Sequence, residues 1–154
     1  MTSIQTSGLT KDFGDLRAVD NISLDLPRGG VAGFVGPNGA GKSTTIRMLL
    51  GWIKPTSGGA EVLGHSIKDP SSYLHRVGAL IEAPAFYPTL TGEENLRVFA
   101  RLGGHHRNRI AEMLEIVGLS DRGDDKYKNY SLGMKQRLGI ALALSGVHPE
   151  PWML

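Results

Sequence analysis

A glycine-rich loop constrains the fold of this chain more than any other feature. It fits the pattern of Gly, four residues, Gly-Lys and Ser or Thr, and consists of Gly36, Pro37, Asn38, Gly39, Ala40, Gly41, Lys42, Ser43 and Thr44. Because Gly39 and Gly41 lack a Cβ, the backbone can curl and point successive N–H groups into one concavity. That concavity opens onto a helix N-terminus, which favours an anion. The pattern predicts a phosphate cradle, with Lys42 on the β- and γ-phosphates and the Ser43 hydroxyl on Mg²⁺.

The residues on either side support this interpretation. Val31–Val35 is a short, mostly apolar run, typical of a buried strand, and residues 44–50 have the apolar spacing of a helix. Strand, loop and helix in this order are the context that a phosphate-binding loop needs. The alternative, a flexible glycine-rich linker, does not account for that order. The sequence therefore predicts binding of a nucleoside polyphosphate.

Length and composition limit the remaining choices. The 154 residues fit one domain, and a hydrophobic content of 40% suffices for a core. A net charge of +2 gives no basic field for nucleic acid, and the absence of Cys excludes thiolate metal sites and disulfides. The first residues show no secretory signal, and the apolar run 138–147 is too short to span a bilayer. We expect a protein that is soluble, or peripheral through a partner.

The first half of the chain is rich in predicted strands. Spaced apolar residues indicate strands at 4–9, 21–26 and 60–63. A short helical connection is expected at 70–75, and a second buried apolar run at 77–81.

The second half is predominantly helical. Thr91 and Glu94 form a predicted capping box, and the helix that follows ends at Gly103. Residues 110–117 have the i, i+3, i+4, i+7 spacing of a second amphipathic helix, and 138–144 form a last, strongly apolar one.

With its two glycine-bearing segments placed, the chain resembles the ATP-binding subunit of an ABC transporter, over all 154 residues and in the family's order. It is similar to about the first two-thirds of such a domain. Phe13 occupies the position of the aromatic that stacks on adenine. Glu82 falls where the family usually has a Gln that contacts Mg²⁺ and the attacking water. Residues 130–134, here called the signature segment, align with Leu-Ser-Gly-Gly-Gln and precede Lys135, Gln136 and Arg137.

The resemblance implies a set of nucleotide contacts beyond Lys42 and Ser43. Besides the phosphate loop and Phe13, these are Ser131, Gly133, Lys135 and Gln136, with Glu82 as a catalytic and metal-binding residue. Glu82, Leu132 and Met134 depart from the family's usual Gln, Gly and Gln. With residues 81–88, these departures resemble exporters that confer self-protection against bacitracin and lantibiotics.

The resemblance also implies a fold and partners. The fold is an α/β P-loop NTPase (RecA-like) core with an N-terminal antiparallel β part and an inserted α-helical subdomain. Residues 1–82 would form the nucleotide-binding core, 83–145 the helical subdomain, and 146–154 the start of the Walker B strand. The implied partners are Mg²⁺ and ATP, a membrane-embedded permease and a second ATP-binding subunit in a head-to-tail dimer. No nucleic acid is expected, and the location is the cytoplasmic face of the membrane.

Hydrolysis in this family needs a Walker B strand that ends in Asp-Glu, and a later switch His. Met153 and Leu154 resemble the beginning of that strand, and His148 precedes it. We therefore expect a fragment with an incomplete sheet that binds nucleotide weakly, does not turn it over and is poorly soluble alone.

Simpler interpretations exist for most of these residues. Phe13 could be an ordinary half-buried aromatic, Glu82 a solvated carboxylate, and Ser131 only a helix cap. His105 and His106 lack ligand partners at metal spacing, so a solvated loop is favoured. A solvated helix entrance is the default for the basic cluster of Lys126, Lys128, Lys135 and Arg137.

Other functions remain open besides the transport ATPase. One is a nucleotide-binding module without turnover, and another is an ABC ATPase of translation or DNA repair. The single-domain length and the helical segment 83–130 favour the transporter. A small GTPase is disfavoured because the sequence has neither Asp-x-x-Gly nor Asn-Lys-x-Asp.

Overall fold

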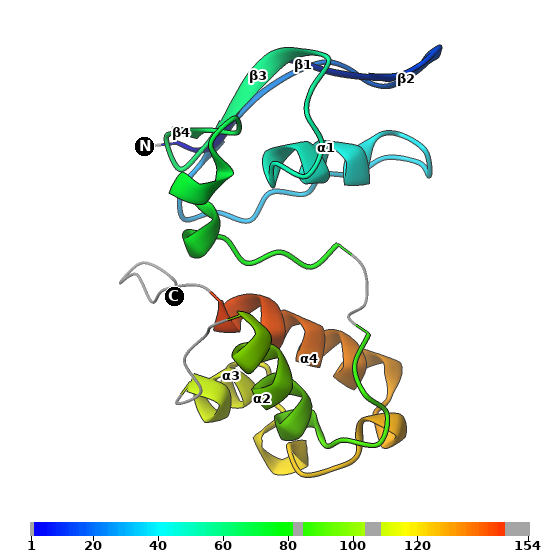
Figure 1. The fold of residues 1–154 in the computed structure, drawn as a ribbon, viewed down its shortest axis with the longest axis vertical. Coiled ribbons are helices and arrows are strands. Elements are labelled where there is room, and N and C mark those ends of the chain that lie inside the picture. Colours follow the sequence, from blue (N-terminus) through cyan, green and yellow to red (C-terminus); the bar gives the residue numbers. More distant parts are fainter. Residues whose placement is uncertain (1, 82–84, 104–108, 147–154) are drawn as a thin grey trace. The chain divides into compact units, whose positions relative to one another are not determined.

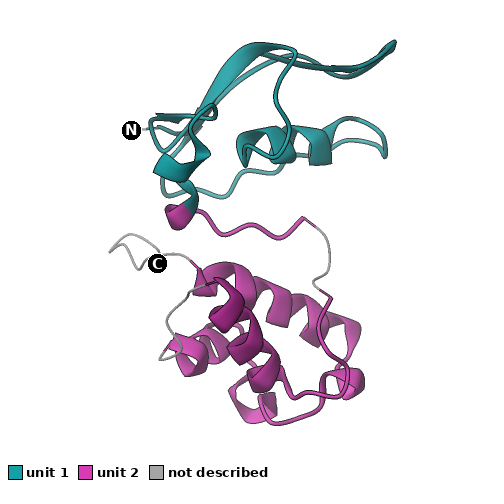
Figure 2. Cartoon of the chain, in the orientation of Figure 1, with its two compact units in different colours: residues 1–74, 149–154 teal, residues 75–148 magenta. Residues whose placement is uncertain are grey.

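The computed structural model describes residues 2–81, 85–103 and 109–146. Two compact units divide these residues, and Figure 2 shows them in different colours: unit 1 ends at Leu74, and unit 2 begins at His75. The three-part division expected from the sequence stays a prediction, because residues 82–84 and 147–154 lie outside the described residues.

Unit 1 is built on an antiparallel sheet of four strands (Figure 1). The strands β1 (Thr2–Phe13), β2 (Leu16–Pro27), β3 (Ser57–Val62) and β4 (His65–Ser66) lie in the order β2-β1-β3-β4. Residues 14 and 15 make the tight turn between β1 and β2, and Gly14 supplies the positive φ of 58° that such turns need. The strands predicted at 4–9, 21–26 and 60–63 are confirmed; the first two extend further at both ends, and the third begins earlier, at Ser57, and ends at Val62.

Helix α1 (Lys42–Leu49) packs on this sheet and supplies part of its core. Met48 is fully buried, and Tyr73 is fully buried with its hydroxyl donating to the Leu49 carbonyl at 2.7 Å. The expected helical connection consists of two short 3₁₀ turns, Pro70–Ser72 and Leu74–Arg76. The other apolar members of this core are buried Leu9, Val19, Leu50, Ala60, Val62 and Ile67.

Two predictions of buried strands are wrong in this structure. Residues 31–35 form no strand, and Val31 and Val35 are 104% and 91% exposed. Residues 77–81 form no strand either, and Leu80 is 41% exposed. An apolar run becomes a buried strand only by pairing with neighbours, and the described sheet, β2-β1-β3-β4, includes neither run.

Unit 2 is a cluster of three helices, α2 (Gly92–Gly103), α3 (Ile110–Ile116) and α4 (Leu132–Ser145) (Figure 1). Short 3₁₀ turns lie at Ser120–Arg122 and Tyr127–Asn129. The capping box of α2 is confirmed: the Thr91 amide donates to Glu94 Oε2 at 2.8 Å, and the Glu94 amide donates to Thr91 Oγ1 at 3.1 Å. The core consists of buried Phe86, Leu96, Ala100, Ile110, Met113, Leu114, Leu119, Tyr130, Leu138 and Ala141.

Helix α4 is longer than the sequence predicted. The apolar pattern indicated residues 138–144, whereas the helix begins at Leu132, directly after its cap Ser131. In the first turn Leu132 and Gly133 are exposed and Met134 and Lys135 are half-buried, so the pattern of a buried apolar face does not begin there, and the predicted cap at Ser131 marks the start instead. Even so, no helix within 2–81, 85–103 or 109–146 is long and apolar enough to cross a membrane.

Candidate functional site

The phosphate loop, residues 36–44, has the backbone that its glycines predict. Gly39 and Gly41 have φ values of 84° and 80°, in the left-handed region where L side chains are strained. A Cβ at Gly41 would also lie 2.2 Å from the Ala18 carbonyl oxygen of β2. Gly41 therefore lets the loop pass against the sheet directly before α1 begins.

Lys42 folds its side chain back over this loop. Its Nζ donates to the carbonyl oxygens of Gly36 at 2.6 Å and Pro37 at 2.8 Å. The Ala40 amide donates to the Pro37 carbonyl at 3.2 Å, which closes a tight turn inside the loop. The ammonium group thus lies beside the concavity, on the element where an anion would meet the helix N-terminus.

The hydroxyl groups in the first turn of α1 have different surroundings. Thr45 is buried, and its Oγ1 donates to the Gly41 carbonyl at 3.0 Å, which ties the helix to the loop. Ser43 is exposed, and Thr44 is half-buried. A hydroxyl oxygen is a hard ligand of the kind that Mg²⁺ accepts beside water and phosphate oxygens, so Ser43 fits the metal-binding role predicted for it.

Phe13 ends β1 with its ring accessible. Its side chain is 47% exposed, and Lys11 Nζ lies 5.0 Å from the ring centroid. In the β1–β2 register, Phe13 is opposite Leu16, which is 67% exposed. A half-exposed ring beside a cation can accept a flat aromatic base, and adenine stacking at Phe13 stays a prediction.

The signature segment forms the start of α4. Ser131 Oγ accepts from the Met134 amide at 3.3 Å, so the predicted cap is present. Leu132 is 73% exposed, and a Cβ at Gly133 would have no heavy atom within 4 Å. Leu132 in place of the family's Gly is therefore accommodated inside this unit, because its side chain points into open space.

The basic residues after the signature segment have separate contacts. Arg137 Nη1 donates to the carbonyls of Gly118 at 2.9 Å and Val117 at 3.2 Å, at the end of α3. Lys135 Nζ lies 5.3 Å from the centroid of the Tyr127 ring. Gln136 is exposed. Arg137 thus joins α4 to α3, and nucleotide contacts by Lys135 and Gln136 stay predictions.

Sequence reasoning missed the structural roles of two buried residues of unit 2. Tyr130 is buried, and its hydroxyl donates to the Arg122 carbonyl at 2.6 Å. Burial raises the pKa of this phenol, and the nearby Asp125 carboxylate raises it further. A Cβ at Gly92 would lie 2.1 Å from that hydroxyl oxygen. Asn95, fully buried in α2, is the second residue. A polar residue on the same helix face as Leu96 and Ala100 was the available signal.

Glu82, the expected catalytic and metal-binding residue, lies outside the described residues. The His105–His106 pair, for which a solvated loop was expected, lies outside them as well. The phosphate loop belongs to unit 1 and the signature segment to unit 2. Among the described residues no cluster of three or more His, Cys, Asp or Glu is placed to hold a metal ion.

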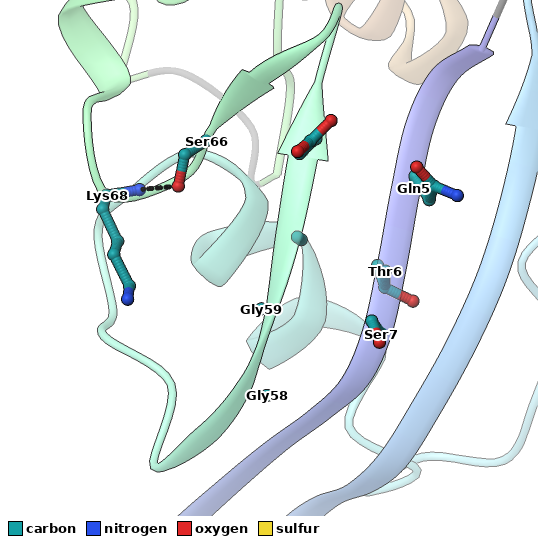
Figure 3. A pocket seen from close by; sticks show the side chains of 9 residues that line it. Gln5, Thr6, Ser7, Gly58, Gly59, Ser66 and Lys68 are labelled. Carbon is teal, nitrogen blue, oxygen red and sulfur yellow. Dashed lines mark hydrogen bonds between the residues drawn. The ribbon is translucent and has the colours of Figure 1, made fainter.

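Unit 1 also has open hollows away from the phosphate loop. One of about 270 Å³ lies over β1, β3 and β4 (Figure 3). Its lining includes the exposed side chains of Gln5, Ser7 and Lys68, and the Lys68 amide donates to Ser66 Oγ at 3.3 Å. These are the side chains of a solvated sheet face, without the curled backbone of the phosphate loop.

Substitution of Ser131 tests its role as the cap of α4. We expect Ser131→Ala to lower the free energy of unfolding of unit 2 by about 1 kcal/mol, because the Met134 amide loses its acceptor. Ser131→Asp keeps an acceptor and adds a charge that suits a helix N-terminus, so it should retain stability. Chemical denaturation followed by circular dichroism measures both. Equal losses in the two variants would contradict the cap.

A family model described as "ABC transporter" matches residues 19–149, and the chain belongs to this family. It is 50% identical over 145 residues to the bacitracin transport ATP-binding protein BcrA of Bacillus licheniformis, covering 93% of this chain and 47% of that protein. It is 43% identical to the daunorubicin/doxorubicin resistance ATP-binding protein DrrA of Streptomyces peucetius, covering 92% and 44%. The chain thus spans about half the length of these curated relatives.

Solved structures show the same fold. An ATP-binding subunit of an ABC transporter superposes with a TM-score of 0.74 at 29% identity, covering 94% of this chain and 62% of that chain. A nucleotide-free ATP-binding cassette superposes with a TM-score of 0.78 at 26% identity, covering 95% and 66%. The predicted fold class is confirmed at this level, although the two apolar runs 31–35 and 77–81 remain outside the sheet.

Proposed function

We propose that this chain is the nucleotide-binding part of an ATPase subunit that energises an ABC exporter. The observation that carries the proposal is the phosphate loop, where the Lys42 ammonium lies over a backbone curled at Gly39 and Gly41. That geometry supplies N–H groups, a helix N-terminus and a cation at one place, which are the parts needed to hold a polyphosphate.

The cargo is proposed from the relatives. The names of two of the similar proteins specify bacitracin transport and daunorubicin/doxorubicin resistance. We propose a peptide antibiotic or similar compound as the exported substrate, in line with the resemblance at residues 81–88. The choice of compound would belong to the permease, because a nucleotide-binding subunit contacts the cargo at most indirectly.

Residues of the phosphate loop, together with Glu82, are also proposed to bind Mg²⁺ and to support the reaction. The metal would neutralise charge on the β- and γ-phosphates, with the exposed Ser43 hydroxyl as a protein ligand. Lys42 would hold the phosphates and stabilise the negative charge that develops as the γ-phosphoryl is transferred to water. Glu82 is proposed to contact the metal or the attacking water.

The proposed assembly has two further components. A permease would place the subunit at the cytoplasmic face of the membrane. A second copy would bind head-to-tail, so that the start of α4 in one copy faces the nucleotide held by the other. The exposed Leu132 and the open space beside Gly133 support this arrangement, since both leave the helix N-terminus accessible.

Direct titration of the chain with nucleotide tests the proposal. We expect calorimetry to show binding of Mg²⁺-ATP, weaker binding of ADP, and none of AMP, because the loop recognises the β- and γ-phosphates. Titration with inorganic triphosphate and Mg²⁺ measures the affinity that the phosphate loop contributes without the contact between Phe13 and the base. No binding of Mg²⁺-ATP at millimolar concentration, by a folded chain, would reject the proposed function.

Gly133→Ala distinguishes a structural from a nucleotide-facing role of α4. In this chain the added Cβ meets open space, so the helix should gain about 0.5–1 kcal/mol of stability from the better propensity of Ala. If the proposed dimer forms, the same Cβ should weaken ATP-dependent dimerisation, measured by analytical ultracentrifugation of the full-length subunit. Glu115→Ala, on the exposed face of α3, is the control. Unchanged dimerisation with bound ATP would exclude close approach at Gly133.

A further inference from the structure

Asn95 is a buried polar side chain that holds one stretch of backbone. It is fully buried in α2, where its Oδ1 accepts from the Tyr87 amide at 2.7 Å. Its Nδ2 donates to the carbonyls of Tyr87 at 3.1 Å and Thr91 at 2.9 Å. One side chain thus satisfies both backbone polar groups of Tyr87, a residue outside any helix or strand.

The same stretch is hydrogen-bonded to a second segment, residues 123–128, here called the strap. The Tyr127 amide donates to the Leu90 carbonyl at 2.9 Å, and the Lys128 amide donates to the Pro88 carbonyl at 3.1 Å. In the other direction, the Gly92 amide donates to the Asp125 carbonyl at 3.1 Å. Segments that lie more than thirty residues apart in sequence therefore share a short backbone ladder.

Aromatic rings continue this connection to the signature segment. Phe86 packs on Phe99 and Tyr127, with ring centroids 5.4 and 5.1 Å apart. Tyr127 in turn lies 5.8 Å from Tyr130, which directly precedes the cap Ser131. Phe86 is buried, so it is fixed on the helical core. The contacts form one continuous path from residue 86 to the first turn of α4.

We propose that Asn95 is a positioning residue that fastens residues 86–91 to α2 in the conformation that pairs with the strap, so that this segment and the start of α4 move as one body. The proposal rests on the proposed function: residues 86–91 follow Glu82 closely in sequence, and the start of α4 is the predicted contact to a second nucleotide. A displacement at one end would then be passed to the other through the ladder and the rings.

The chemistry of the site explains why an amide is needed here. An apolar side chain at position 95 would leave the Tyr87 N–H without its acceptor, and the Tyr87 carbonyl with only the Leu90 amide, which donates to it at 3.2 Å. A carboxylate could still accept from the Tyr87 amide, but it has no hydrogen to offer the carbonyls of Tyr87 and Thr91. Only a group with an acceptor and two donors meets the observed pattern.

The positioning role of Asn95 is tested by amide-resolved hydrogen exchange. The variants are Asn95→Leu and Asn95→Asp, each in the full chain. We expect Tyr127 and Lys128, the donors to Leu90 and Pro88, to exchange at least about tenfold faster than in the wild type. Ile110→Val thins the same core without touching the ladder, and it serves as the control. In Ile110→Val, the ratio of the exchange rate of the strap amides to that of the core amides should stay at the wild-type value. If Asn95→Leu fails to fold, Asn95→Asp, which keeps the volume and the acceptor, decides the question.

Steady-state kinetics of the full-length subunit with its permease provide a second measurement. We expect both Asn95 variants to lower kcat for ATP hydrolysis several-fold and leave KM unchanged, because the phosphate loop and Phe13, the proposed ground-state contacts to ATP, lie in unit 1 and are not altered. Wild-type exchange rates at Tyr127 and Lys128 in the variants would overturn the inference, as would a rise in KM without a change in kcat. A wild-type protein that fails to bind Mg²⁺-ATP would instead reject the proposed function, and the exchange result would still stand.

Discussion

Lys42→Ala should abolish measurable binding of Mg²⁺-ATP. In the structure the Lys42 ammonium donates to two loop carbonyls, of Gly36 and Pro37, which places it where it can exchange these partners for phosphate oxygens. Two charge-assisted hydrogen bonds to a polyphosphate contribute together about 3 kcal/mol or more, so the affinity should fall at least about a hundredfold. Isothermal titration calorimetry with the wild type and the variant measures the loss.

The control is a lysine of the same unit that lies away from the loop. Lys68 is exposed at the hollow over β3 and β4, and Lys68→Ala removes the same charge from unit 1. It should leave the affinity within a few-fold of the wild type. Circular dichroism should show both variants folded, because the hydrogen bonds of the Lys42 ammonium go to carbonyls of the loop. Equal losses for the two lysines would mean that net charge, and not the loop, governs binding.

Gly92→Ala should destabilise unit 2 and displace the signature segment. The added Cβ would lie 2.1 Å from the Tyr130 hydroxyl oxygen and 2.9 Å from Cζ of the same ring. Tyr130 is buried and its hydroxyl is bound to the Arg122 carbonyl, so the ring has little room to retreat. Overpacking of this kind costs about 1–3 kcal/mol in the free energy of unfolding. Urea denaturation measures it.

A matched substitution and a double variant make this prediction specific. Gly133→Ala changes the same residue type in the first turn of α4, where the Cβ meets open space, and should not lower stability. Tyr130→Phe in the Gly92→Ala background removes the closest atom of the clash. The double variant should therefore be more stable than the sum of the single changes predicts. Strict additivity would show that Gly92 and Tyr130 do not interact.

The parts of the fold that depend on local chemistry could be predicted from the sequence. Gly39 and Gly41 indicated a curled loop, Thr91 with Glu94 indicated a helix start, and Ser131 indicated a cap; each has the expected backbone or hydrogen bonds. These features involve residues within a few positions of each other. Their geometry is therefore encoded in short stretches of sequence.

The features that depend on distant partners could not be predicted in the same way. The run 31–35 is as apolar as a core strand, yet its exposure depends on whether another strand pairs with it. Asn95 and Gly92 owe their roles to Tyr87 and Tyr130, which no periodicity connects to them. At Leu132, the departure from the family pattern became interpretable only when its side chain was seen to point outward.

The separate core of unit 2 has a consequence for how such proteins can diversify. All ten of its buried apolar residues come from positions 86 to 141, so substitutions there can be compensated without involving the sheet that carries the phosphate loop. Natural selection could thus reshape the core of the helical half while the sheet and the phosphate loop are inherited unchanged. The two units can in this way diverge at different rates within one chain.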